Sequence, residues 1–119
     1  MAQRFEPGDF LVFQLEAGFA LMRLLAVDES DGFKTWHVAA YLDLFPDVDS
    51  AEIASATPER LTISHPHIAL TNRAFESTQV ARISNAAFTE SELESLRAWR
   101  NDPHREVSDR SVRLMLGLR

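Results

Sequence analysis

The sequence predicts an α+β fold, a small bent antiparallel sheet or SH3-like barrel of about five strands with two or three packed helices. Two observations carry this prediction. The apolar runs 9–15 and 19–27 are separated by a short Glu-Ala-Gly break at 16–18, a pattern typical of a β-hairpin. A capped amphipathic segment after Phe88 predicts a helix that covers the sheet.

The composition is that of one ordinary globular domain. The chain has 119 residues, 45% of them hydrophobic and 25% charged, and no cysteine. It therefore has neither a disulfide framework nor a thiolate metal site. The predicted domain covers residues 1–119, with a β-rich part at 1–84 and a helical cover at 85–119. The N-terminus lacks the apolar core of a signal peptide and no run is long enough to span a membrane, so we expect a cytoplasmic protein without a membrane partner.

The charge is unevenly distributed along the chain. The first 60 residues carry 11 acidic and 4 basic side chains, and the remaining residues carry 7 acidic and 8 basic ones. An acidic half disfavours binding to phosphate backbones, so we expect no nucleic-acid partner. It favours a basic protein partner through electrostatic steering. The alternative, that the acidic surface only keeps the protein in solution, stays open.

Both faces of the predicted hairpin are largely apolar. A strand with one face in water alternates apolar and polar side chains, and neither run does so. We therefore expect the later helices to cover the second face. A bare second face would instead be a binding surface or the interface of a homodimer.

Arg23 interrupts the second apolar run at its centre. A buried guanidinium needs a partner. We expect an ion pair with an acidic residue of a neighbouring strand, Asp9 being one possibility. The alternative is a site arginine on the surface of the barrel.

Further strands are predicted after the turn-rich segment 28–32. Three sequential strands joined by short turns favour an antiparallel meander. A proline inside a strand favours an edge position. These strands are predicted at 33–42, at 61–64 and 67–70 as one strand bent at Pro66, and, after a polar turn around 71–73, at 79–84.

A capping box predicts a short helix over residues 50–56. Asp49 would accept a backbone hydrogen bond and Glu52 would reach back to the cap. Val48 and Ile53 would pack together outside this box as a hydrophobic staple.

A second capping box, Thr89 with Glu92, predicts a helix that ends near Arg100. Phe88 and Leu93 form its staple pair. The side chains expected to face the sheet are Leu93, Leu96 and Trp99.

The C-terminal tail fits two structures. Ser108 can cap a helix over 109–116, with Gly117 and Leu118 as a Schellman ending. The alternation of apolar residues from Val112 to Leu118 leaves a strand open. We predict the helix.

The metal candidates are His65 and His67. In an extended segment residues two apart point the same way, so two imidazoles could share an ion. A metal- or small-molecule-binding protein that uses this pair is therefore the alternative function. The residues available to complete such a site are His37, Tyr41, Asp43 and His104.

Nothing in the sequence argues for catalysis. There is no glycine-rich phosphate loop and no nucleophile beside a recognisable base, so we expect neither enzymatic activity nor a cofactor. Asp43, Asp47 and Asp49 could be taken as a cation or acid–base cluster. They lack the glycine and terminal glutamate of an EF-hand loop, and a structural role is favoured.

The hairpin region also carries a family pattern. Its elements are Pro7-Gly8-Asp9-Phe10, Phe13, Leu15, Gly18-Phe19-Ala20, Arg23-Leu24-Leu25 and the later Tyr41-Leu42-Asp43-Leu44-Phe45. Over residues 5–53 this pattern resembles immunity protein twenty-six and related SH3-like barrel proteins. It departs from them at Leu21-Met22, where the family tends to have a glycine before the arginine. The resemblance implies a small bacterial cytoplasmic protein that neutralises a partner toxin, and it transfers no catalytic residues.

We therefore expect a non-enzymatic protein-binding module, with an immunity-type inhibitor of a basic protein as its most specific form. A structural homodimer is a further alternative. The acidic residues expected to contact the partner are Asp28, Glu29, Asp31, Asp43 and Asp47.

Overall fold

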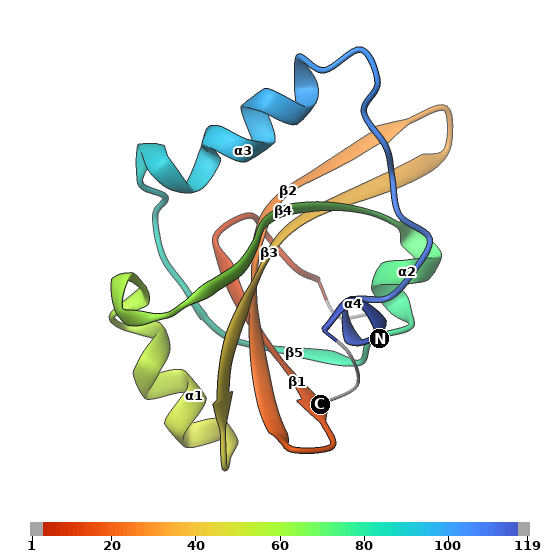
Figure 1. Ribbon diagram of the computed structural model, residues 1–119. Helices are drawn as coiled ribbons and strands as arrows, with labels where there is room; N and C mark the ends of the chain where they lie inside the picture. Colours follow the sequence, from red (N-terminus) through yellow and green to blue (C-terminus); the bar gives the residue numbers. More distant parts are fainter. Residues whose placement is uncertain (1–3, 117–119) are drawn as a thin grey trace.

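The computed structural model describes residues 4–116 and has the expected α+β architecture (Figure 1). One antiparallel sheet has the strand order β4-β3-β2-β1-β5. Its strands are β1 (Asp9–Leu15), β2 (Gly18–Ser30), β3 (Phe33–Phe45), β4 (Ile63–Thr71) and β5 (Val80–Asn85). The helices are α1 (Val48–Ser55), the 3-10 turn Pro58–Arg60, α2 (Asn72–Glu76), α3 (Glu90–Arg100) and α4 (Val112–Met115).

The sheet is open, so the barrel form of the prediction is wrong. Closure would require β4 to pair with β5, but each of them pairs with one strand only. Part of the free edge of β4 is occupied by the C-terminal segment. The backbone N–H of Thr71 donates to the Ser108 carbonyl at 2.9 Å, and that of Ser108 donates to the Ala69 carbonyl at 2.7 Å.

The bend of the sheet comes from irregular register along the long central strands. β2 and β3 shift register between Ala20 and Met22 and again between Leu24 and Ala26. Such bulges bend a strand and increase its twist. β2 and β3 also extend into the segment 28–32, for which the sequence predicts a turn. Only Asp31 and Gly32 form the turn, both with positive φ (52° and 81°), as a two-residue hairpin loop requires.

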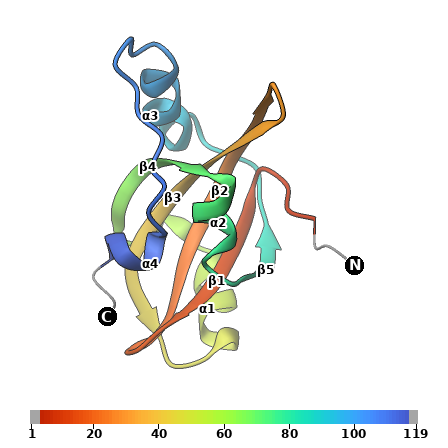
Figure 2. The same cartoon turned by 90° about the vertical axis from the view of Figure 1, so that its right-hand side faces the viewer.

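Helices cover both faces of the hairpin, as expected. Figure 1 shows α1 and α3 on one side of the sheet and α2 and α4 on the other, and Figure 2 shows the latter pair in front of the strands. Leu11 and Met22 pack with α2 and α4, whereas Leu21 and Leu25 pack with α1 and α3 respectively. All four are buried. The hairpin therefore has no bare apolar face for a partner or for a second copy.

Arg23 is 1% exposed and lies on the face covered by α3. Its Nε donates to Glu92 Oε2 at 3.1 Å, its Nη2 donates to the Ala87 carbonyl at 3.0 Å, and its Nη1 donates to the Gly8 carbonyl. The guanidinium lies between two aromatic rings, 4.3 Å from the Phe10 centroid and 4.7 Å from that of Phe88. A buried arginine is thus satisfied by hydrogen bonds, a charge and two π faces.

The predicted partner, Asp9, does not pair with Arg23. Phe10 is the cross-strand neighbour of Arg23, so the adjacent Asp9 points to the opposite face of the sheet. There it accepts hydrogen bonds from the Glu6 N–H and the Asn85 side chain, both at 2.8 Å.

The capping box of α3 is confirmed. The Thr89 side chain accepts from the Glu92 N–H, and Glu92 Oε1 accepts from the Thr89 N–H at 2.8 Å. The other carboxylate oxygen of Glu92 accepts from Arg23. One side chain therefore both starts the helix and docks it on the sheet.

The predicted start of α1 is wrong by two residues. Asp47 is the cap, and its Oδ1 accepts from the Ser50 N–H at 2.7 Å. Asp49 therefore lies in the first turn. Ile53 is 75% exposed, so it does not form the predicted staple with Val48.

The remaining elements refine the predictions. β4 is a single edge strand, as expected. The tail forms a helix, but it is shorter than predicted and is capped by Ser111 rather than Ser108. The predicted Schellman ending at 117–118 lies outside the described residues. The polar turn predicted at 71–73 instead begins α2, whose cap is Thr71.

The contribution of the Arg23–Glu92 contact to stability can be tested with alanine variants. We expect Glu92→Ala to lower the free energy of unfolding by about 3 kcal/mol or more, because it leaves a buried guanidinium without its counter-charge. Thr89→Ala removes only the cap and should cost about 1 kcal/mol. Glu94→Ala, on the exposed side of α3, should stay within about 0.5 kcal/mol of the wild type. Urea unfolding measures all three, and equal losses for Glu92→Ala and Glu94→Ala would contradict this account.

Candidate functional site

The densest group of chemically active side chains lies between the sheet and α3. His37 of β3 is fully buried. Its Nε2 lies 2.9 Å from Asp28 Oδ2, and its Nδ1 lies 2.9 Å from His67 Nε2. Arg100 donates to the other oxygen of Asp28 at 2.8 Å. The four residues form a continuous hydrogen-bonded chain, here called the histidine chain.

Trp99 covers the histidine chain. Its ring centroid lies 4.8 Å from that of His37 and 5.6 Å from that of His67. The indole N–H donates to the Glu106 carbonyl at 2.8 Å, which ties the segment after α3 to the same position. Because α3 supplies both Trp99 and Arg100, the histidine chain is covered and completed only when this helix is docked.

The hydrogen bonds assign the protons of the two neutral imidazoles. An ionised Asp28 accepts, so His37 carries its proton on Nε2 and accepts at Nδ1 from the Nε2–H of His67. His67 is then left with an unprotonated Nδ1. This nitrogen is the hydrogen-bond acceptor at the outer end of the chain.

Burial keeps both histidines neutral. Burial lowers the pKa of His37, and the hydrogen bond and charge of Asp28 oppose this shift only in part. Burial lowers the pKa of His67 to about 4, assisted by His37 and by the charge of Arg100. A pKa this far below neutrality makes His67 a weak base at pH 7. A structural or recognition role therefore fits it better than proton transfer.

His65 and His67 line one shallow groove together with His104 and Trp99. However, Nε2 of His67 is bonded to His37, and Nδ1 of His65 lies 2.9 Å from the Ser64 hydroxyl. Within residues 4–116, no three histidine or acidic side chains are placed to hold a metal ion.

The other residues considered for a metal or ligand site have different surroundings. Asp43 accepts from the Thr62 N–H at 2.6 Å. Tyr41 is buried against Phe10, and burial raises its pKa to about 12. Neither of them joins the two histidines.

The five acidic residues predicted to contact a partner fall into two groups. Asp28, Glu29 and Asp31 belong to the β2–β3 hairpin, whereas Asp43 and Asp47 lie where β3 leads into α1. Figure 1 places the hairpin tip and the start of α1 at opposite ends of the molecule. The hairpin group is partly neutralised, since Asp28 pairs with Arg100 and Glu29 lies opposite Lys34.

The second group is larger than the sequence indicated. Asp49 and Glu52, first taken as a capping pair, are exposed on α1, beside the exposed Ile53. Within residues 4–116 none of the acidic side chains of this group forms an ion pair. Hydrogen bonds from Ser50 also lower the pKa of Asp47, which keeps it charged. We call this group the α1 acidic surface: Asp43, Asp47, Asp49, Glu52 and Ile53.

Comparisons of the chain with protein-family models, with curated proteins and with solved structures give no match. The resemblance to immunity protein twenty-six therefore stays a prediction. Among the helices of residues 4–116, none combines the length and apolarity needed to cross a membrane.

The histidine chain could not be predicted from the sequence because its members are far apart along the polypeptide. His37 and His67 are 30 residues apart, and Arg100 is 72 residues from Asp28. One signal was available. His37 lies within a strand whose alternate residues are apolar, and a polar residue there needs a partner of its own.

The lowered pKa values predict a pH-dependent stability. Both histidines have a lower pKa folded than unfolded, so the unfolded chain binds protons first as the pH falls below 6.5. Their contribution to stability is complete above pH 6.5 and is lost towards pH 4, by roughly 2 kcal/mol for His67.

Urea unfolding of the wild type and His67→Gln across this pH range measures the effect. Carboxylates titrate in both proteins, so the difference between the two curves isolates His67. We expect a smaller loss in His67→Gln and an unchanged loss in His104→Gln, whose side chain is exposed. Parallel curves for the wild type and His67→Gln would show that His67 is not held neutral.

Proposed function

We propose that this protein is a non-enzymatic binding protein that holds a basic protein partner on its α1 acidic surface. One observation carries the proposal: four acidic residues at and just before α1, three of them exposed, form no ion pair within residues 4–116, and the same helix presents a 75% exposed isoleucine. The predicted hairpin residues Asp28, Glu29 and Asp31 form a second acidic region, which we regard as secondary because it is partly neutralised.

The chemistry of this surface suits a cationic protein in two ways. Its uncompensated negative field speeds the encounter with a positively charged surface. The exposed Ile53 supplies apolar area beside the charges, and interfaces gain most of their affinity from such desolvated positions.

The resemblance of residues 5–53 to immunity protein twenty-six favours a toxin as the partner. An inhibitor of this kind works by covering a basic active or substrate-binding surface, so it needs no reactive group of its own. The alternative function, metal binding through His65 and His67, has less support because each of them has a ring nitrogen engaged within the fold.

Charge reversal on α1 tests the proposal. Asp49→Lys with Glu52→Lys leaves the capping residue Asp47 intact. With the tagged protein as bait in a lysate of its source cell, we expect the wild type to retain a basic protein at low salt and release it at high salt. At low salt the double variant should lose that protein, and Ile53→Asp should weaken its retention although it adds a negative charge, because it removes the exposed apolar area.

The matched control is Glu94→Lys with Glu106→Lys, two exposed acidic residues outside the α1 acidic surface. This control should retain the partner. Equal retention by the α1 double variant, or the absence of any retained basic protein, would rule the proposal out. Circular dichroism and urea unfolding confirm that each bait is folded.

A further inference from the structure

The histidine chain has room for one proton between its two imidazoles. Nδ1 of His37 and Nε2 of His67 are 2.9 Å apart, a distance that fits a single N–H···N hydrogen bond. In the neutral pair this proton belongs to His67, because His37 donates from its other nitrogen to Asp28. One further proton can bind at Nδ1 of His67. A second would place N–H against N–H across the same gap, so the docked pair excludes it.

Trp99 is the part of this layer that can move. The sheet joins β3 to β4, with His37 opposite Ala69, so the two strands do not separate to widen the gap. The imidazole rings have to turn instead. The ring of Trp99 packs on both of them, with centroids 4.8 Å from His37 and 5.6 Å from His67. Turning the rings therefore displaces Trp99.

The two ends of α3 are attached to the sheet in different ways. Of its residues 90–100, all of which the structure describes, only Leu96 is buried. The start of the helix is fixed by the ion pair of Glu92 with Arg23, whereas its end is fixed by Trp99 and by the bond from Arg100 to the histidine chain. An element with few buried apolar contacts opens at low free energy. The end of α3 can therefore detach while its start stays in place.

Charged and titratable groups face the two imidazoles from each neighbouring element. Asp28 of β2 favours added positive charge on His37, whereas Arg100 of α3 opposes it on both rings. The other such groups line the groove of His67: they are His65 of β4 and, after α3, Asp102, His104, Arg105 and Glu106.

We propose that residues 99–107 are an acid-released strap: a second added proton on His37 and His67 opens the gap between them, and Trp99 leaves the sheet while the sheet stays folded. The indole N–H of Trp99 donates to the Glu106 carbonyl, so the segment after the helix belongs to the strap. The inference does not rest on the function proposed above. It also differs from a general loss of stability in acid, because it confines the opening to one part of the molecule.

Acid drives the release because the docked rings bind protons weakly. Burial lowers the pKa of both imidazoles, that of His67 to about 4, whereas an imidazole in water titrates near pH 6.5. As the pH falls from 6 to 5, the released form therefore binds up to two more protons than the docked form. Each such proton favours release by up to about tenfold per pH unit.

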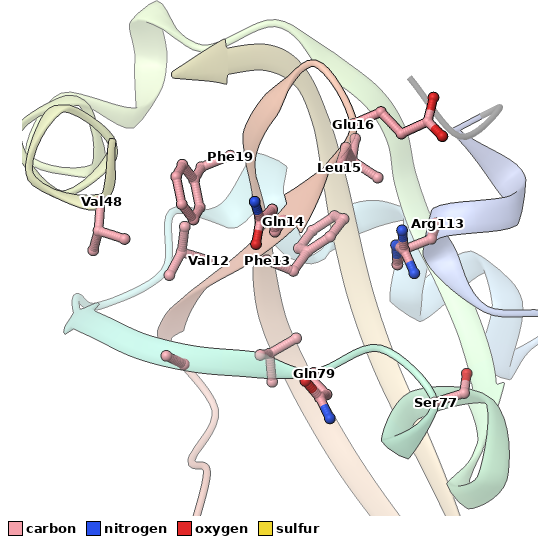
Figure 3. A pocket seen from close by; sticks show the side chains of 12 residues that line it. Val12, Phe13, Gln14, Leu15, Glu16, Phe19, Val48, Ser77, Gln79 and Arg113 are labelled. Atoms are coloured by element: carbon pink, nitrogen blue, oxygen red, sulfur yellow. The ribbon is translucent and has the colours of Figure 1, made fainter. Parts of the chain in front are cut away.

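The far end of the sheet gives the internal reference for this release. Figure 3 shows the cleft of about 820 Å³ at the turn of the β1–β2 hairpin, with Val48 of α1 at one side and Arg113 of α4 at the other. Among the described residues that line it, none belongs to α3 or to the strap. The amides of β1 should therefore keep their protection when the strap opens.

Hydrogen exchange followed by NMR on the full-length protein tests the strap. Each rate is divided into the intrinsic rate at the same pH to give a protection factor. Between pH 6 and 5 we expect the protection of the Trp99 indole N–H to fall by up to about a hundredfold, since two protons bind on release. The Trp36 indole N–H, which donates to Asn72 at 2.9 Å, should keep its protection, as should β1. An equal loss at both tryptophans, or a fall of tenfold or less at Trp99, would overturn the proposal.

A glutamine at position 67 removes the conflict over the shared proton. Its amide can either donate to Nδ1 of His37 or accept from it, so the gap tolerates both protonation states. In His67→Gln we expect the fall at Trp99 to be about tenfold or less. The matched control is His65→Gln, two residues earlier on β4, which should keep the full fall. An undiminished fall in His67→Gln would refute the role of the histidine pair.

Discussion

The structure depends on the burial of one guanidinium. Arg23 lies in the middle of the central strand β2, where its hydrogen bonds join three distant parts of the chain: the N-terminal turn at Gly8, the segment before α3 at Ala87, and α3 itself at Glu92. An unpaired charge at this position would be too costly to bury. The fold therefore requires α3 to lie where it does, and the rings of Phe10 and Phe88 pack against the buried guanidinium.

The position of α3 in turn completes the histidine chain. The helix carries Trp99 and Arg100 over His37, while the strands supply the remaining members. The hydrogen bonds of His37 to Asp28 and to His67 join the strands themselves, and the docked helix adds the cation and the indole cover. The α1 acidic surface lies at the other end of the molecule from α3 (Figure 1).

Local patterns in the sequence predicted the local structure well. The two apolar runs within residues 9–27, which do not alternate with polar residues, predicted a hairpin that is covered on both faces. Thr89 with Glu92 predicted the start of α3. Each of these patterns acts over a few residues. Contacts between distant residues were not predictable in this way. The partner of Arg23 lies 69 residues away, and the nearer Asp9 was excluded only by the face on which it lies.

The sequence also does not decide which of two nearby residues caps a helix. Asp47 and Asp49 are both good caps, and only the path of the chain out of β3 selects Asp47. Because Asp47 is the cap, Asp49 and Ile53 do not serve as the predicted cap and staple residue. Both are exposed on α1. The prediction allowed both a bent open sheet and a barrel, and the structure shows the open sheet, in which β4 and β5 do not pair. The sequence pattern of the strands themselves fits an open sheet and a barrel alike.

The double role of Glu92 has a consequence for biosynthesis. All five strands are present once residue 85 has been made, yet Arg23 then has no carboxylate and the edge of β4 lacks the segment around Ser108. A nascent chain of that length cannot complete its second core face. Stable folding must therefore wait until the segment that contains Glu92 and Ser108 has left the ribosome, so this domain folds as a unit rather than strand by strand.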